Sequence, residues 1–97
     1  MIRYYMYRND NGVDVFKLED SDNRHPEEIY YASLVAHGDD YYETEAFMLY
    51  LDEDGCNIIA EIIHLDDIEE GKRKNPGAIP VRDISDYLRE AEEAVLD

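Results

Sequence analysis

Two apolar runs on either side of a short acidic turn constrain the fold of this chain more than any other feature. Residues 46–51 and 57–65 are rich in aliphatic and aromatic side chains, and residues 52–55 (Asp-Glu-Asp-Gly) lie between them. Strand, turn and strand is the natural interpretation of this pattern. The second run is β-branched and nearly continuous, so we expect it to be a central strand that is covered on both faces.

A second hairpin is predicted at the N-terminus. Residues 2–8 are rich in aromatic side chains and residues 13–18 return as a second strand-like run. The Asn and Gly residues of segment 9–12 tolerate the positive φ that tight hairpin turns require. Because hydrophobic and polar residues alternate imperfectly in 13–18, the pattern does not indicate which face of that strand is buried.

A helix is predicted after this hairpin. Pro26 suits a first helical turn, Glu27 and Glu28 suit the positive end of the helix dipole, and Gly38 is placed to end the helix. A strand over residues 29–36 remains an alternative, because a short apolar run does not separate the two structures.

The C-terminal segment has the clearest helical period. Its apolar residues recur at i, i+3, i+4, i+7 and i+11, which is one face of an amphipathic helix: Ile84, Tyr87, Leu88, Ala91 and Val95. Residues 66–80 contain two glycines and two prolines and are predicted to be an exposed loop. We therefore expect one α+β domain over residues 1–97, with a small antiparallel sheet of about four strands in two hairpins. The C-terminal helix would pack on one face, in the order ββαββα.

The net charge is far outside the usual range for a small domain. Twenty-five Asp and Glu residues face nine Lys and Arg residues, which gives a formal charge of −16, whereas a magnitude of about 2–8 is typical. Self-repulsion of this size costs stability, so we expect either a cationic partner or a salty environment to offset it. Nucleic acids and anionic membranes are disfavoured as direct partners, because their phosphates have the same sign of charge.

The acidic residues are concentrated in the middle of the chain. No Lys or Arg occurs between Arg24 and Lys72. The predicted hairpin of 46–51 and 57–65 would bring two acidic segments together at its open end, with Tyr41 and Tyr42 as aromatic anchors. The predicted contact carboxylates are Asp39, Asp40, Glu43, Glu45, Asp66, Asp67, Glu69 and Glu70. A generic solvated surface, including one adapted to high salt, is the alternative interpretation.

The paired tyrosines give a further expectation. Adjacent residues of a strand face opposite sides, so one member of each of the pairs 4–5, 30–31 and 41–42 should be exposed.

No catalytic residues, metal site or cofactor are predicted. The turn at 52–55 lacks the first carboxylate ligand of a calcium loop, because Tyr50 stands at that position. Glu70 and Lys72 match only part of a nuclease signature. The three histidines lack the paired spacing of a zinc site, and Cys56 has no neighbouring Lys, Arg or His to activate it.

Size and charge are similar to those of small DNA-mimic inhibitors of phages, including anti-restriction and anti-CRISPR proteins, and to those of bacterial immunity proteins. The predicted function is that of an acidic inhibitor that blocks the nucleic-acid-binding groove of a basic protein, such as a nuclease. A structural or regulatory interaction module is the alternative, including a homodimer formed through an edge strand, an immunity protein or an antitoxin. One cysteine and the absence of a signal-like N-terminus or an apolar span predict a cytoplasmic protein, in the host cytosol if the protein is viral.

Overall fold

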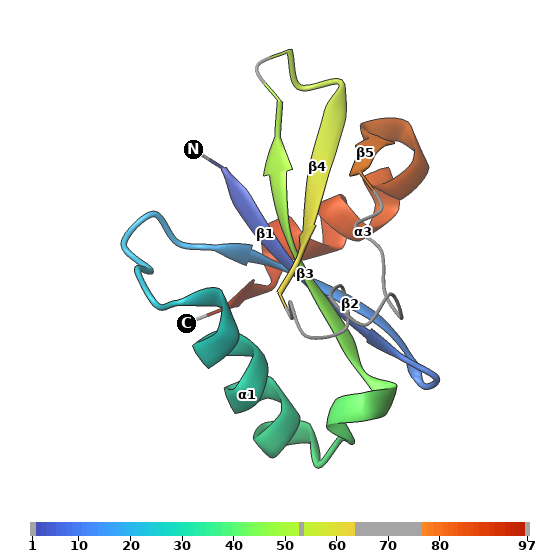
Figure 1. Cartoon of the computed structure of the whole chain (residues 1–97). Helices are drawn as coiled ribbons and strands as arrows, with labels where there is room; N and C mark the ends of the chain where they lie inside the picture. Colours follow the sequence, from blue (N-terminus) through green and yellow to red (C-terminus); the bar gives the residue numbers. More distant parts are fainter. Residues whose placement is uncertain (1, 53, 64–76, 97) are drawn as a thin grey trace.

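The computed structural model describes residues 2–52, 54–63 and 77–96, which form one sheet with a helix on each face (Figure 1). The elements in chain order are β1 (Arg3–Asn9), β2 (Gly12–Leu18), α1 (Pro26–His37), the 3-10 helix η1 (Tyr41–Glu43), β3 (Glu45–Leu51), β4 (Asn57–Ile62), β5 (Gly77–Pro80), α3 (Val81–Glu93) and β6 (Val95–Leu96). No helix among these residues is long and apolar enough to cross a membrane.

Six strands of the described chain form the sheet, in the order β5-β4-β3-β1-β2-β6. The first five strands of this order run antiparallel to their neighbours, and β6 pairs parallel to β2. The α+β class and both predicted hairpins are therefore confirmed. The predicted count of four strands is too low, because two short strands were not expected.

Both short strands lie in segments that were predicted to have another structure. Residues 77–80 were expected in a loop but form β5 against β4, with Ile79 opposite Ile58. The amphipathic helix was expected to reach Val95, but it ends at Glu93 and Val95 pairs with Lys17 of β2. Two or four residues between Gly, Pro and helix signals are too few to produce a period, so pairing with a distant strand decides their structure.

The structure settles the alternative for residues 29–36 in favour of a helix. Pro26 is the first residue of α1, and the His25 side chain accepts a hydrogen bond from the Glu27 backbone N–H. Gly38 ends the helix in the left-handed conformation at φ 67°, which a residue with a Cβ adopts only under strain. The end signals in the sequence were thus more informative than the apolar run itself.

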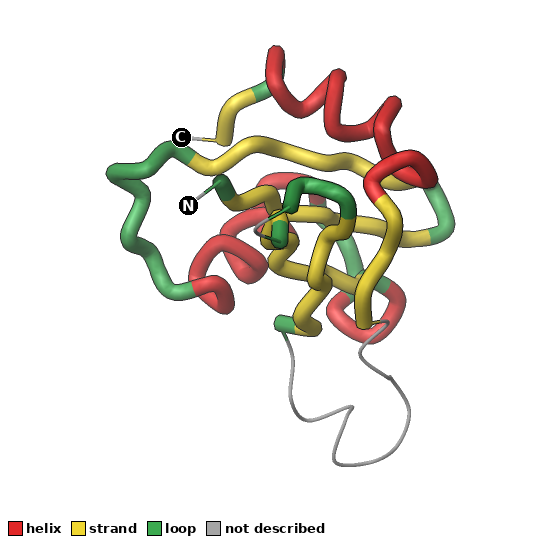
Figure 2. The backbone as a smooth tube through the Cα atoms, turned by 90° about the horizontal axis from the view of Figure 1, so that it is seen from above, coloured by secondary structure: helices red, strands yellow, loops and turns green. Residues whose placement is uncertain are grey.

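Helices α1 and α3 lie on opposite faces of the sheet, which Figure 2 shows from above. Leu88 and Ala91 of α3 pack on an aliphatic cluster that includes Leu49 and Ile58. Ile29, Tyr30 and Leu34 of α1 pack on the other face, against a cluster rich in tyrosines. The predicted packing of the C-terminal helix on one face is confirmed, and the second helix makes the arrangement three layers deep.

The strands that are covered on both faces are β1 and β3, at the centre of the sheet. Four consecutive residues of each are buried. In β4 only alternate residues are buried, and Ile59 is 40% exposed. The run from residue 57 has a strand on each side, as expected, but the expectation that both of its faces are covered is wrong, because its β-branched composition records strand propensity and not coverage.

Coverage of both faces also changes the expectation that one tyrosine of each adjacent pair is exposed. Tyr4 and Tyr5 face opposite sides of β1, yet both are buried, because a helix covers each side. The expectation of one exposed partner is wrong for this pair. It holds for Tyr31 on α1 and for Tyr42 on η1, which are 48% and 81% exposed.

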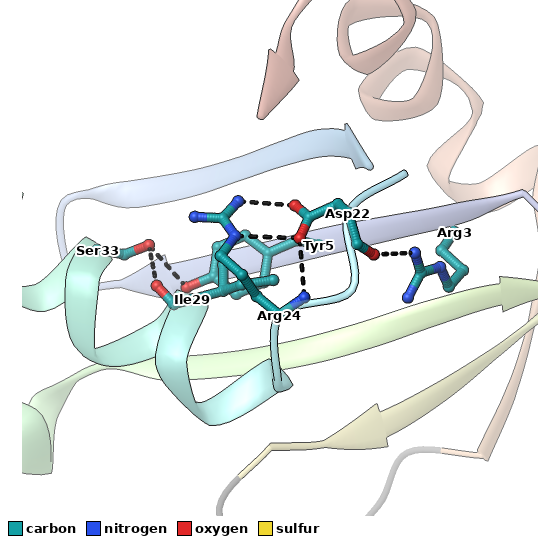
Figure 3. Close-up of polar contacts among 6 residues, drawn as sticks. All are labelled: Arg3, Tyr5, Asp22, Arg24, Ile29 and Ser33. Atoms are coloured by element: carbon teal, nitrogen blue, oxygen red, sulfur yellow. Dashed lines mark hydrogen bonds and ion pairs between the residues drawn. The ribbon is translucent and has the colours of Figure 1, made fainter. Parts of the chain in front are cut away.

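Polar contacts fix α1 and the preceding loop to β1 (Figure 3). The Tyr5 hydroxyl donates to Ser33 Oγ at 3.1 Å, and the Ser33 hydroxyl donates to the Ile29 carbonyl. In the loop, Arg24 binds the Asp22 carboxylate with two nitrogens, and these hydrogen bonds lower the pKa of Asp22. Helix α1 is therefore held in a defined position, which matters for the site at its C-terminal end.

Candidate functional site

The end of the sheet at the β1–β2 turn contains the candidate site. The turn begins with Asn9, whose side chain accepts a hydrogen bond from the Asn11 backbone N–H at 2.9 Å. Gly12 follows at φ 143°, a conformation that favours glycine. The C-terminal end of α1 and the helix η1 lie against this turn, because β1 pairs with β3 and places Arg8 opposite Glu45.

The loop after α1 brings Asp39 back to β1. Gly38 N–H and Asp39 N–H donate to the carbonyls of Val35 and Leu34 in the last turn of the helix. The Tyr7 hydroxyl donates a short hydrogen bond to the Asp39 carboxylate. Burial, together with this carboxylate, raises the pKa of Tyr7 well above its usual value. His37 lies edge-on to the Tyr7 ring, with 5.2 Å between the ring centroids.

Helix η1 is held at both of its ends. Asp40 accepts a hydrogen bond from the Tyr42 backbone N–H at 2.7 Å. The buried Tyr30 hydroxyl donates to the carbonyl oxygens of Thr44 and Tyr41, at 2.6 and 3.2 Å. The backbone that carries these acidic residues is therefore fixed by α1 and does not depend on the carboxylates alone.

Two hollows open between the β1–β2 turn and the end of α1. The larger hollow has a volume of about 340 Å³, and it is lined by Tyr7, Asn9, Asn11, Gly12, Val13, Asp14, His37 and Asp39. The smaller hollow, of about 50 Å³, is lined by Asn9, Asp10, Asn11, Asp39, Asp40, Glu43 and Thr44. Three residues line both, so the hollows adjoin.

We call the five carboxylates around these hollows the acidic rim: Asp10, Asp14, Asp39, Asp40 and Glu43. In the described part of the chain, neither hollow has a Lys or Arg in its lining. Among the residues that the structure describes, none of the five carboxylates forms an ion pair with Lys or Arg. Within the described ranges, His37 is a potential cation beside the rim, and its Nδ1 lies 3.8 Å from Asp39 Oδ2.

The Lys and Arg residues of the described chain are engaged elsewhere. Arg8, Lys17, Arg24, Arg82 and Arg89 each pair with a carboxylate, and Arg3 donates to the Asp22 carbonyl. Glu45 is the predicted contact that this pairing removes, since its Oε2 lies 3.2 Å from the Arg8 guanidinium. The rim therefore keeps a charge that the described part of the molecule does not neutralise.

The predicted contact residues have different outcomes. Asp39, Asp40 and Glu43 lie together on the rim, and Tyr42 is exposed beside them. Tyr41 is half-buried and stacks on Tyr31, with 6.2 Å between centroids, so it is largely part of the packing. The four acids of segment 66–70, namely Asp66, Asp67, Glu69 and Glu70, lie outside the described residues.

Sequence reasoning missed two of the rim carboxylates, Asp10 and Asp14, and the side chains of Tyr7 and His37. Tyr7, Asp10 and Asp14 approach Asp39 through the pairing of β1 with β3, which joins strands more than 35 positions apart, whereas His37 is only two residues from Asp39 in the chain. The sequence contains no local signal of that pairing.

Acidic residues also occur on other parts of the surface. Asp83, Asp86, Glu90 and Glu93 are exposed on α3. At the β3–β4 turn, burial would raise the pKa of Asp52, but hydrogen bonds from Asn57, Cys56 and Gly55 outweigh this effect and lower it. Asp52 thus has its hydrogen-bonding partners inside the turn, unlike Asp10, Asp14 and Glu43 on the rim.

The rim offers acceptors and not a metal-binding geometry. In the described ranges no three His, Cys, Asp or Glu side chains lie close enough to hold a metal ion. Carboxylate oxygens accept hydrogen bonds from ammonium and guanidinium groups, and such charge-assisted bonds are stronger than neutral ones. The negative end of the α1 dipole lies at the same place and adds to the attraction for cations.

Comparisons of the chain with models of protein families, with curated proteins and with solved structures found no match.

Proposed function

We propose that this protein is a non-catalytic binding protein whose acidic rim docks on a basic surface of another protein, one that otherwise binds nucleic acid. The observation that carries the proposal is the set of five rim carboxylates around two adjoining hollows, whose described lining contains no Lys or Arg. Surfaces that bind nucleic acid present several Arg and Lys together to neutralise phosphates. The rim would compete with phosphates for those side chains.

Electrostatics supports binding at this end of the molecule. With a net charge of −16, the whole chain attracts basic partners and raises their association rate. Asp10, Asp14 and Glu43 are exposed, and no hydrogen bond of their side chains is found within the described residues. Their carboxylates would lose no internal contact when a partner's guanidinium or ammonium groups arrive.

A second candidate is a module whose acidic surface serves solubility or a different interaction. The exposed acids of α3 favour it, because they place negative charge on the face opposite α1. If the protein competes with nucleic acid, binding depends on the carboxylates of the rim in particular. If its acidic surface is generic, binding depends only on the total negative charge. The two candidates therefore differ in their response to charge-matched substitutions.

The test compares two triple variants. In the rim variant, Asp10→Asn, Asp14→Asn and Glu43→Gln remove three charges. In the control, Asp54→Asn, Glu90→Gln and Glu93→Gln remove the same charge at the far turn and on α3. Immobilised proteins capture partners from a lysate of the source organism at low salt, and a short DNA duplex is then added as competitor.

We expect wild-type protein and the control variant to capture the same nucleic-acid-binding proteins, and the duplex to release them. The rim variant should lose these partners. Equal loss from both variants would favour the generic acidic surface. Partners that depend on the rim but are not released by the duplex would contradict competition with nucleic acid.

A further inference from the structure

A third hollow lies along the seam between α1 and strands β1 and β2. Its volume is about 200 Å³, and Tyr7, Phe16, Arg24, Ile29, Ala32, Ser33, Ala36 and His37 line it. We call it the apolar hollow, because aliphatic and aromatic side chains form most of its wall. Ala32 and Ala36 are four residues apart on α1, and their small side chains leave Phe16 of β2 only partly covered.

The apolar hollow adjoins the larger acidic hollow. Tyr7 and His37 line both of them. Together the hollows make a groove with an apolar section beside α1 and an acidic section at the end of the sheet. Arg24 lies in the apolar section, where its guanidinium is bound to the Asp22 carboxylate (Figure 3).

The surface of α1 beside this groove is unusually apolar for an exposed helix. Tyr31, Ala32, Val35 and Ala36 are all exposed, and Val35 is 83% exposed. Charged residues normally cover the outer face of such a helix. From Ile29 to Ala36 the helix has no charged residue, so its outer face is suited to contact with another molecule.

We infer that the groove binds a polypeptide segment of the basic partner in which an apolar side chain stands next to Arg or Lys. This inference rests on the proposed function and adds which chemistry is recognised. The apolar side chain would enter the hollow beside Ala32 and Ala36, and the cation would reach Asp14 and Asp39 past Tyr7 and His37.

Charge complementarity selects this occupant over a second copy of the chain. A second copy would bring a further charge of −16 to the rim, and the Lys and Arg residues of its described part already contact acidic residues or a backbone carbonyl. A purely apolar segment would leave the rim carboxylates unmatched. A purely cationic segment would leave the apolar hollow and the exposed α1 side chains in water, and would forgo the favourable burial of that apolar surface.

The test uses an array of synthetic peptides that combine one Phe with two Arg at each spacing, and fluorescence anisotropy for the best binder. One matched peptide replaces Phe by Ser, and another replaces Arg by citrulline, which is uncharged. Ala36→Leu fills the apolar hollow, and Asp14→Asn removes a rim charge. Ala78→Leu, at the exposed position of β5, and Asp54→Asn at the far turn are the controls, and thermal unfolding checks that every variant folds.

We expect Ala36→Leu and Asp14→Asn each to weaken the best peptide about tenfold, and both controls to bind like the wild type. In addition, Ala36→Leu should abolish the preference for Phe over Ser, and Asp14→Asn should reduce the preference for Arg over citrulline.

Two outcomes would overturn the inference, and they differ in what they say of the proposed function. Suppose that Asp14→Asn weakens binding while Ala36→Leu and a second filling variant, Ala32→Leu, do not. The inference that the apolar hollow binds a side chain is then wrong, and the proposal that the acidic rim binds the partner is retained. If Asp14→Asn and Asp54→Asn have equal effects, the rim is not a specific site and the proposed function fails as well.

Discussion

The two faces of the sheet are held together by different chemistry. On the face under α3 the cluster is mostly aliphatic, with Val15, Leu49 and Ile58 among its members. On the face under α1 the cluster includes three buried tyrosines, whose hydroxyls donate to specific acceptors: Tyr5 to Ser33, Tyr7 to Asp39 and Tyr30 to Thr44. Aliphatic burial is non-directional, whereas a buried hydroxyl requires its partner in place.

This difference explains why the candidate site lies on the α1 side. Each tyrosine hydrogen bond fixes a piece of backbone relative to the sheet, so the loop around Asp39 and the helix η1 have defined positions. The α3 side supplies mainly apolar burial, which tolerates substitutions that conserve side-chain volume better than a directional hydrogen bond does. Stability should therefore depend more on the α3 face, and binding more on the α1 face.

The largest expected effect on the free energy of unfolding comes from two adjacent residues of β3 that face opposite sides of the sheet. Leu49→Ala should lower the free energy of unfolding by about 3–4 kcal/mol, because it opens a cavity in the aliphatic cluster, where Leu49 is 0% exposed. Met48→Ala on the α1 side should cost about 2 kcal/mol, since methionine packs more adaptably. Urea unfolding measures both, and a larger loss for Met48→Ala would reverse the comparison.

Alkaline pH should destabilise both faces through their buried tyrosines. Burial raises the pKa of Tyr5 from 10.0 to about 12, although its bond to Ser33 acts the other way. Burial and the Glu92 carboxylate raise the pKa of Tyr4 from 10.0 to about 12. Below pH 10 these tyrosines are protonated in both the folded and the unfolded protein. Between the unfolded pKa of 10.0 and the folded pKa of about 12 they ionise only in the unfolded chain. The free energy of unfolding therefore falls as pH rises through this range, by about 3 kcal/mol for each tyrosine.

Tyrosinate absorbance and far-ultraviolet circular dichroism, followed together, measure this transition. Tyr4→Phe and Tyr5→Phe should each reduce the dependence of stability on alkaline pH, one from each face. Ionisation of every tyrosine near its ordinary pKa without loss of secondary structure would show that neither face protects them.

The hydroxyl groups of Tyr30 and Tyr5, both on the α1 face, should differ by a smaller amount in their contribution to stability. Tyr30→Phe removes the donor to the carbonyls of Thr44 and Tyr41 and should cost about 1–2 kcal/mol. Tyr5→Phe should cost less at neutral pH, because the Ser33 hydroxyl keeps its bond to Ile29. Tyr30→Phe should also weaken binding of the Phe/Arg peptide, since η1 carries Glu43 of the rim. Unchanged binding would separate the tyrosine network from the site.

Local signals explain which parts of the fold could be predicted. The hairpins follow from turn residues between strand-like runs, and α3 follows from its helical period. Helix α1 was decided by Pro26 and Gly38, which act on the backbone itself. The coverage of β1 could not be predicted, because buried and exposed tyrosines look the same in a sequence.

The candidate site was predictable only where it is continuous in the chain. Asp39, Asp40 and Glu43 were expected together because they are neighbours in sequence. The register of β1 on β3 brings Asp10 and Asp14 to them, with Arg8 opposite Glu45. The same register pairs Glu45 with Arg8 and removes it from the rim. Charge counted along the chain therefore located the acidic region and three of its members, but not Asp10 and Asp14.

The smallest effect concerns the ion pair that joins α3 to β2. Glu92 accepts hydrogen bonds from Lys17 at 2.9 Å and from the Tyr4 hydroxyl at 2.6 Å, and the Lys17 contact is the larger cause of its lowered pKa. A carboxylate with a lowered folded pKa stabilises the protein above its unfolded pKa, and this contribution is lost as pH falls through the folded value. The Lys17 and Glu92 side chains are both partly exposed. Glu92→Gln should therefore lower the free energy of unfolding by less than about 1 kcal/mol at neutral pH.

Glu93→Gln is the matched control, because it removes the same charge from the next residue of α3. It should leave stability unchanged or raise it slightly by reducing self-repulsion. Urea midpoints at neutral pH, and again below the folded pKa of Glu92, measure the two variants. The deficit of Glu92→Gln should disappear in acid, where Glu92 of the wild type is also neutral. A deficit that persists there would mean that α3 is held at this point by packing and not by charge, which would make the α3 face still less polar than the comparison with α1 already implies.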